Sequence, residues 1–250
     1  MFSGEVIAVT SGKGGVGKST VSVNLALALK KLGKKVAIVD LDIYGFSVPK
    51  LLGISARPKT VNERIIPVEA HGIKVMSMGF LIKGNEPVVW RGPMLGKMVN
   101  HFWSDVQWGE LDYMILDLPP GTGDVALDMH QLIPQSKEIV VTTPHEAATH
   151  VAERAGSMAI KTDHEIIGVV ENMAFFTPPG TEDQYYLFGK GGGETLADTL
   201  NTELISSLPI EPPYPDGTTP VLYEEGTVLH DHFLDLAKKV LVKTNQTSNV

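Results

Sequence analysis

Residues Gly12-Lys13-Gly14-Gly15-Val16-Gly17-Lys18-Ser19 decide the fold of this 250-residue chain. They fit the pattern G-x-x-x-x-G-K-[ST], between an apolar run at 5–10 and a segment at 18–32 whose apolar side chains recur at helical spacing. Glycines at a strand-to-helix turn let successive backbone N–H groups point at one anion, and the start of the helix adds the positive end of its dipole. The stretch therefore predicts a phosphate-binding loop.

Three side chains of this loop have expected contacts with a nucleoside triphosphate. Lys18 is predicted to contact the β- and γ-phosphates and to stabilise the charge that develops on hydrolysis, Ser19 to bind Mg²⁺, and Thr20 to reach the α-phosphate. The surrounding backbone would come from Gly12, Lys13, Gly14, Gly15, Val16 and Gly17. A glycine-rich turn without a ligand is the alternative, and the eight-residue match in a strand–helix context argues against it.

Acidic residues end two further apolar runs. Asp117 closes the run at 113–117 and is the candidate second anchor for Mg²⁺. Asp40 and Asp42 lie at the end of the run at 36–40. We assign Asp42 to orienting or deprotonating the attacking water, and Asp40 to the Mg²⁺ site from behind the direct ligands. Capping of a loop is the alternative for these two acids.

The apolar runs predict a parallel sheet. They lack polar alternation, as strands buried on both faces do, and helical stretches between them supply the crossovers. The predicted strands are residues 5–10, 36–40, 73–76, 113–117, 138–143, 166–171 and 204–209, and the predicted helices are residues 18–32, 94–108, 125–133, 147–162, a short one ending at 200, and 229–242. The sequence thus predicts an α/β fold, a doubly wound, mostly parallel sheet flanked by helices, as one P-loop domain over residues 1–243. Residues 244–250 are expected to form a disordered polar tail.

The composition excludes several classes of protein. Lys and Arg total 21 against 29 Asp and Glu, and the net charge of −8 disfavours generic binding to nucleic-acid backbones or anionic membranes. The chain has no cysteine, which excludes disulfides, thiolate nucleophiles and cysteine-ligated metal centres within it. Its longest apolar runs are about six residues, where a membrane-spanning helix needs about twenty. We therefore expect a cytoplasmic protein with no membrane attachment.

A family resemblance rests on Lys13 and on motifs spread over nearly the whole chain. The extra lysine at the loop start is similar to that of the deviant P-loop in MinD, ParA and nitrogenase-iron-protein-like ATPases. Within that class the chain resembles the Mrp/ApbC-type ATPases, a family of iron–sulfur cluster carriers. The motifs are residues 42–45 (DIYG), 77–80 (SMGF), 90–94 (WRGPM), 108–113 (WGELDY), 117–124 (DLPPGTGD), 171–173 (ENM) and 188–193 (FGKGGG).

The resemblance implies an ATP-hydrolysing homodimer that is switched by its nucleotide, with ATP and Mg²⁺ as cofactors. It implies that Lys13 is catalytic in trans, reaching the partner's phosphates across a face-to-face dimer, in the manner of an arginine finger. It also implies that Asn172 reads adenine, for which an amide that both donates and accepts is suited. Pro209 and Ile210 would form the other side of the base pocket.

Members of the family carry their cluster on a C-x-x-C motif between the ENM and FGxGGG segments. In this chain the loop length is kept, but Pro178 and Thr181 occupy the two cysteine positions. Proline has no side-chain donor atom for iron, and threonine is a poor ligand. The resemblance implies cluster carriage, whereas the residues present argue against it.

The loop from Phe175 to Phe188 is the densest cluster of aromatic and proline residues in the chain. Such side chains are favoured at protein interfaces, so we expect an unidentified protein client or the second subunit to bind there; local packing under the loop is the alternative. A second hypothesis for the function is an ATP-dependent regulator that binds DNA or a protein without transferring a cluster. The lysines at 30, 31, 34 and 35 would then be candidate DNA contacts. A third hypothesis keeps the cluster role, with ligands supplied by a partner.

Overall fold

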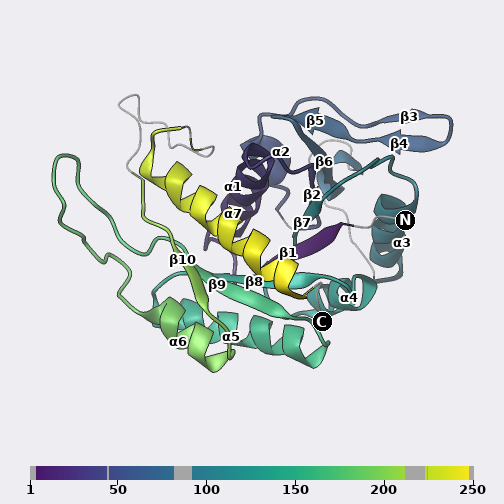
Figure 1. Ribbon diagram of the computed structural model, residues 1–250. Coiled ribbons are helices and arrows are strands. Elements are labelled where there is room, and N and C mark those ends of the chain that lie inside the picture. Colours follow the sequence, from purple (N-terminus) through teal and green to yellow (C-terminus); the bar gives the residue numbers. More distant parts are fainter. Residues whose placement is uncertain (1–3, 44, 82–91, 212–222, 224, 248–250) are drawn as a thin grey trace.

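The computed structural model describes residues 4–43, 45–81, 92–211, 223 and 225–247 (Figure 1). An eight-stranded sheet runs through it in the order β10-β9-β8-β1-β7-β2-β6-β5. Its strands are β1 (Glu5–Ser11), β2 (Val36–Asp40), β5 (Val68–Ala70), β6 (Ile73–Ser77), β7 (Tyr113–Asp117), β8 (Lys137–Thr142), β9 (Ile166–Glu171) and β10 (Leu204–Ser207). Within this sheet β5 is antiparallel to β6 and all other neighbours are parallel, which confirms the predicted fold class.

Helices cover both faces of the sheet (Figure 1). They are α1 (Lys18–Lys31), α2 (Val48–Leu51), α3 (Gly92–Ser104), α4 (Asp124–Leu132), α5 (Glu146–Lys161), α6 (Gly192–Thr199) and α7 (Val228–Thr247), with a 3₁₀ turn at Met78–Leu81. One face packs under α1, α2 and α7, with buried Ile7, Leu25 and Phe233. The other face packs under α3 to α6, with buried Phe102 and Leu196. No helix in the described ranges is long and apolar enough to cross a membrane.

The strand register sets the geometry of the functional edge. Asp40 at the end of β2 is the register partner of Asp117 at the end of β7, and Val9 of β1 is the partner of Asp117 on its other side. Parallel strands present their carboxyl ends at one edge of a sheet, where ligands bind in open α/β folds. The loop after β1 and the acids that follow β2 and β7 therefore meet at the same edge.

The helix predicted at 94–108 is shorter in the structure. α3 ends at Ser104, and the chain then runs alongside Ile65, which exchanges two backbone hydrogen bonds of 2.8 Å with Asp105 and Gln107. The ring of Trp108 turns into the core, and its indole N–H donates to the Phe102 carbonyl at 2.8 Å. The helical spacing seen up to residue 108 thus reflects burial in the same core and not further helical backbone.

Two β features were absent from the prediction, the edge strand β5 and a separate hairpin of β3 (Lys59–Val61) and β4 (Arg64–Ile66). The hairpin turn is formed by Asn62 and Glu63, with φ angles of 48° and 63°. Two positive φ values in a two-residue loop are typical of a type I′ turn, which usually carries glycine at its second position. Because Glu63 stands where glycine is usual, the sequence does not show the typical pattern of a hairpin turn.

The predicted disordered tail is wrong at its first residues, because α7 continues to Thr247. The Thr244 side chain is fully buried, and its Oγ1 lies 2.7 Å from the hydroxyl of Tyr113 on β7. A buried hydroxyl pair of this kind satisfies two polar groups inside the core. It fixes the last turns of α7 on the sheet, so the expected boundary at 243 falls inside a helix; residues 248–250 lie outside the described ranges.

Candidate functional site

The loop between β1 and α1 surrounds a hollow of about 280 Å³ at the carboxyl edge of the sheet. Its lining includes Lys13, Gly14, Gly15, Lys18, Ser19 and Thr20. Gly15 and Gly17 have φ angles of +83° and +85°, a backbone conformation that favours glycine. α1 starts at Lys18 without a side-chain cap and with no acid in its first turn, which leaves the positive end of the helix dipole open to an anion.

The glycines of the loop have different surroundings. A Cβ on Gly14 or Gly15 would meet nothing within 4 Å, so both leave open space over the hollow. A Cβ on Gly12 would lie 2.2 Å from the backbone carbonyl carbon of Val151, because α5 packs directly on the start of the loop. Gly14 and Gly15 thus leave space over the hollow, and Gly12 makes room for a helix.

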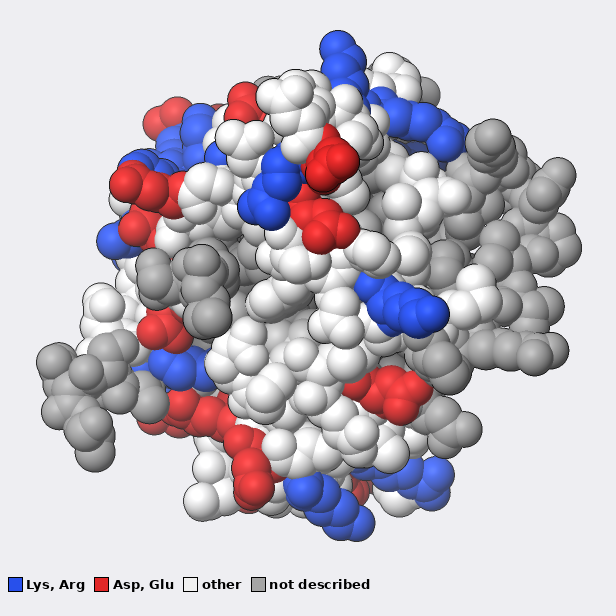
Figure 2. Space-filling view, turned by 90° about the vertical axis from the view of Figure 1, so that its right-hand side faces the viewer, with Lys and Arg blue, Asp and Glu red and all other residues white. Residues whose placement is uncertain are grey.

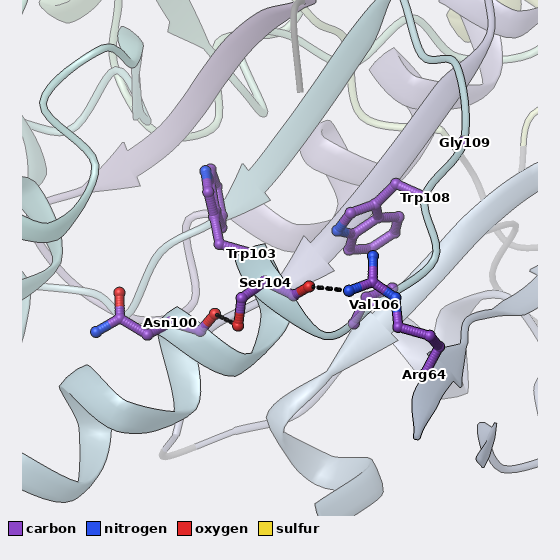
Figure 3. Close-up of a pocket in the computed structure, with 7 residues that line it drawn as sticks. All are labelled: Arg64, Asn100, Trp103, Ser104, Val106, Trp108 and Gly109. Atoms are coloured by element: carbon purple, nitrogen blue, oxygen red, sulfur yellow. Dashed lines mark hydrogen bonds between the residues drawn. The ribbon is translucent and has the colours of Figure 1, made fainter. Parts of the chain in front are cut away.

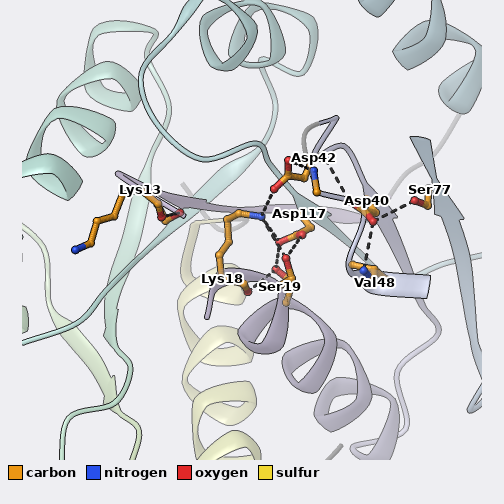
Figure 4. A network of polar contacts seen from close by, with 11 residues as sticks. Lys13, Lys18, Ser19, Asp40, Asp42, Val48, Ser77 and Asp117 are labelled. Atoms are coloured by element: carbon orange, nitrogen blue, oxygen red, sulfur yellow. Dashed lines mark hydrogen bonds and ion pairs between the residues drawn. The ribbon is translucent and has the colours of Figure 1, made fainter. Parts of the chain in front are cut away.

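A polar network around Asp117 lies at the base of the hollow (Figure 4). The Lys18 ammonium is 2.8 Å from Asp117 Oδ1, and the Ser19 hydroxyl donates to Asp117 Oδ2 at 2.6 Å. Ser22, which no sequence motif indicated, donates to Asp117 Oδ1 at 2.7 Å from one turn further along α1. A hydroxyl and a carboxylate side by side are the hard oxygen donors that Mg²⁺ prefers, so Ser19 and Asp117 fit that ion.

Asp42 and Asp40 have separate environments. Asp42 lines the hollow, with Oδ2 3.7 Å from the Lys18 ammonium and Oδ1 accepting from the Gly45 N–H at 3.2 Å. Asp40 is fully buried behind it and accepts from the Ser77 hydroxyl at 3.0 Å and from the Val48 N–H at 3.3 Å. Burial, and then the charge of Asp117, raise the pKa of Asp40 well above its ordinary value. Its oxygens support the turn into α2, which suits a role behind the direct Mg²⁺ ligands.

Lys13 is exposed, and its side chain points away from the Lys18 and Asp117 network of its own chain (Figure 4). Its backbone carbonyl accepts from the Ser11 hydroxyl at 3.1 Å, which fixes the loop while leaving the ammonium outside.

The residues expected around the adenine base fall into two groups. Asn172, directly after β9, donates from Nδ2 to the Val16 carbonyl at 2.9 Å, so it contacts the phosphate loop itself. Pro209 is buried, and the Ile210 N–H donates to the Phe175 carbonyl at 2.7 Å. Neither Pro209 nor Ile210 is among the described residues that line the hollow.

The aromatic loop extends from the body as an arm (Figure 1). Phe176 and Tyr185 exchange two backbone hydrogen bonds, of 2.9 and 2.8 Å, which close the arm as a hairpin. Near its far end Pro178 accepts from the Thr181 N–H at 3.2 Å, with Gly180 at a φ of +80°. Beyond Tyr185 the side chains are exposed, with Leu187 at 61%. The arm thus presents apolar groups to solvent instead of burying them under a loop.

A second, wider hollow of about 730 Å³ lies away from the phosphate loop, beside the hairpin of β3 and β4 (Figure 3). Trp103 and Trp108 line it, and Arg64 crosses it to donate to the Ser104 carbonyl at 2.7 Å. No residue predicted to bind nucleotide lines this hollow among the described ones.

The lysines at the end of α1 are partly neutralised within the chain. Lys31 is 3.0 Å from Glu225, and Lys35 is 2.5 Å from Glu110. On the face that carries α3, acidic and basic side chains are intermingled in the described part of the surface (Figure 2). This distribution favours local ion pairing over a continuous basic surface.

The fold and the site together define a P-loop NTPase. A family model described as ParA, NUBPL iron-transfer P-loop NTPase, matches residues 3–241. The chain belongs to this family. Among its curated relatives is the iron–sulfur cluster carrier protein of Bacillus subtilis, 57% identical over 239 residues, which are 95% of this chain and 68% of that protein. The corresponding protein of Mycobacterium tuberculosis is 50% identical over 214 residues, 83% of this chain and 56% of that one.

Solved structures of related proteins have a similar fold. A nucleotide-binding protein of Archaeoglobus fulgidus in complex with ADP is 38% identical, with a TM-score of 0.74 over 94% of this chain and 87% of that one. The cell division ATPase MinD of Pyrococcus furiosus is 22% identical with a TM-score of 0.68, over 96% of this chain and 99% of that one, which establishes the common fold alone.

Proposed function

We propose that this protein is a Mg²⁺-dependent ATPase that acts as a nucleotide-switched homodimer. The observation that carries the proposal is the contact of Lys18 and Ser19 with Asp117 at the base of the hollow, with Asp42 on its wall. ADP is bound in the relative from Archaeoglobus fulgidus. The chain spans only part of the length of its curated relatives, so the proposed activity rests on the residues of this chain's own site.

In the proposed reaction, water attacks the γ-phosphorus in line with the bond to the β–γ bridging oxygen. Asp42 accepts a hydrogen bond from this water and positions it, since its carboxylate lines the hollow within 3.7 Å of Lys18. The Lys18 ammonium partly gives up its ion pair with Asp117 and contacts the phosphate oxygens. Lys13 of the other subunit places a second positive charge at the same γ-phosphate. Mg²⁺, held by Ser19 and backed by Asp117, would neutralise charge on the β- and γ-phosphates.

Asn172 supports a link between the base and the phosphates. Its amide contacts the Val16 carbonyl, so a nucleotide that engages this amide would reposition the phosphate loop. We propose that Asn172 reads adenine and that Pro209 and Ile210 lie near the base, on the element that joins the aromatic arm. The arm would bind a protein client or the second subunit, because it exposes Tyr185 and Phe188, residue types enriched in protein interfaces, beside the exposed apolar Leu187.

The cluster role named for the relatives does not transfer through thiolate ligands, because this chain has no cysteine. We propose that any cluster handled together with this protein is a cargo whose ligands come from a partner. A regulator that binds DNA is the less favoured reading, since Lys31 and Lys35 are paired with acids.

Calorimetry and phosphate release test the proposal. Wild-type protein should bind ATP with Mg²⁺ and release phosphate, Lys18→Ala should lose about 10- to 100-fold in nucleotide affinity, and Asp42→Ala should bind ATP while hydrolysis falls about 100- to 10,000-fold. Asp198→Ala, an exposed acid on α6, is the matched control and should behave as wild type. Normal turnover in Asp42→Ala would reassign the water-positioning role, and absence of ATP binding by folded wild-type protein would end the proposal.

A further inference from the structure

A groove of about 460 Å³ lies between α4 and α5. Leu127 of α4 and Met158 of α5 give it partly apolar walls, and Thr122, in the loop between β7 and α4, stands at one end. The remaining lining residues on α5 include Arg154, Ser157 and Lys161. The groove is separate from the phosphate hollow, since none of its lining residues is shared with it.

The groove carries unpaired positive charge. The exposed side chains of Arg154 and Lys161 have no ion pair or hydrogen bond with any other described residue. Seven residues apart on α5, they lie on one helix face about 10 Å from each other. Glu153 is the one acid among the described lining residues, and its carboxylate lies 3.8 Å from His150 Nδ1, so two cations face one acid in this groove. In a chain of net charge −8, this face is complementary to an acidic ligand.

The α5 wall and the Thr122 end of the groove both lie against the start of the phosphate loop. On one side α5 packs on Gly12 so closely that a Cβ there would lie 2.2 Å from the Val151 backbone. On the other side Gly121, next to Thr122, donates its N–H to the Ser11 carbonyl at 2.8 Å. A movement of the chain at Ser11 and Gly12 would therefore shift the α5 wall relative to the Thr122 end of the groove.

We propose that the groove between α4 and α5 is a docking site for an acidic, amphipathic segment of a partner protein. Carboxylates of the segment pair with Arg154 and Lys161, and its apolar side chains lie on Leu127 and Met158. The bound nucleotide sets the affinity for the segment through the contacts at Ser11 and Gly12, a coupling that rests on the proposed function. An isolated acidic residue would gain little at such exposed cations, whereas a segment that engages both and the apolar walls gains specificity.

Peptide titration tests the proposal on the full chain. The probe is a fluorescein-labelled peptide of Glu and Leu at helical spacing, with a control peptide in which every Glu is Lys. Wild-type protein should bind the acidic peptide and not the basic one, with an affinity that falls as salt rises. Arg154→Glu combined with Lys161→Glu should weaken binding by at least about tenfold. Lys59→Glu with Lys97→Glu reverses two exposed charges elsewhere and should leave the affinity unchanged.

Three results would overturn the docking site: no binding of the acidic peptide, equal binding of both peptides, or unchanged affinity in the Arg154 and Lys161 variant. Sedimentation of the same variant tests whether the groove instead binds a second copy of the chain. If the wild type is a dimer and the variant is not, the groove is assigned to that second copy. Titration with ADP and with a non-hydrolysable ATP analogue tests the coupling, which requires different peptide affinities in the two states. Equal affinities, with the acidic preference intact, would remove the coupling and not the site.

Discussion

The side-chain amide of Asn172 occupies the space that a side chain on Gly17 would need. A Cβ built on Gly17 lies 2.1 Å from Asn172 Nδ2, and Gly17 itself has a φ of +85°. Two independent constraints, backbone conformation and a neighbour 155 positions away in sequence, therefore require glycine at the last position before Lys18. The phosphate loop is thus fixed from the side of β9 as well as from β1.

Gly17→Ala should destabilise the protein without nucleotide. The left-handed backbone costs about 1–3 kcal/mol and the clash with Asn172 a further ~1–3 kcal/mol. Gly14→Ala is the control, since its Cβ would meet nothing within 4 Å, and its melting temperature should stay near wild type. Asn172→Ala in the Gly17→Ala background should recover part of the loss. Equal melting temperatures for the two glycine variants would contradict this account.

Two inactive variants should complement each other if Lys13 acts across the dimer. Lys13→Ala and Asp42→Ala each lack one part of every site in their own homodimers. In a mixed dimer the Lys13→Ala subunit keeps its own Asp42 and receives Lys13 from its neighbour, which restores one site. Phosphate release after mixing equal amounts should reach about a quarter of the wild-type rate, because half of the dimers are mixed and each has one complete site. No recovery, with mixed dimers present, would place Lys13 in cis.

A buried His–Glu pair predicts a pH-dependent stability. His130 Nε2 on α4 lies 2.6 Å from Glu138 Oε1 on β8, and both side chains are buried. Burial lowers the pKa of His130, but the Glu138 carboxylate and the Ala126 carbonyl raise it, and the net pKa lies above the ordinary 6.5. A pKa that is higher in the folded state means that the protonated histidine stabilises the folded protein. This stabilisation is complete below about pH 6.5, the ordinary pKa, and is lost as the pH rises through the folded-state pKa.

Urea unfolding at a series of pH values measures this effect. Above pH 6.5 the free energy of unfolding of the wild type should fall with a contribution from His130 of up to about 1.4 kcal/mol per pH unit. Glu138→Gln removes the charge that holds the proton, so this contribution should disappear. Glu182→Gln, an exposed acid in the aromatic arm, should keep the wild-type slope. Identical slopes in Glu138→Gln and wild type would show that His130 does not hold the extra proton.

Replacing Pro178 and Thr181 with cysteine should create a cluster ligand pair. The two positions close one turn, in which the Thr181 N–H and hydroxyl both contact the Pro178 carbonyl, at 3.2 and 3.1 Å. After anaerobic incubation with iron and sulfide, the wild type should retain no iron through a desalting column. The double variant should retain iron with visible charge-transfer absorbance, and Pro178→Cys alone should retain far less. Stoichiometric iron on the wild type would refute our reading of the cysteine-free chain.

Much of the fold was predictable because its signals are local. Continuous apolar runs predicted β1, β2, β7 and β9 within about one residue, since strands of a covered parallel sheet carry no polar face. The missed strands β3, β4 and β5 are each three residues long and partly or wholly exposed. The turn between β3 and β4 also lacks glycine at its second position. The end of α3 was missed because Trp108 joins the same core from a non-helical backbone.

The candidate site was predictable where a motif fixes both residue type and place. Lys18, Ser19 and Asp117 come together as expected, because the motif and the strand end share one edge of the sheet. Ser22 was missed, since a serine inside a helix carries no signal until the direction of α1 relative to β7 is known. The contact of Asn172 with Val16 was likewise hidden, as it depends on how the turn after β9 crosses the loop.

The glycines of the phosphate loop are required for different physical reasons, and this affects which of them are kept when such a motif changes in evolution. Gly12 is demanded by α5, while Gly14 and Gly15 border open space that only a ligand would use. A lineage that ceased to use nucleotide could lose Gly14 and still fold, but it would retain Gly12 as a relic of packing. Partial matches to the motif in distant sequences can therefore record inherited architecture after the chemistry has gone.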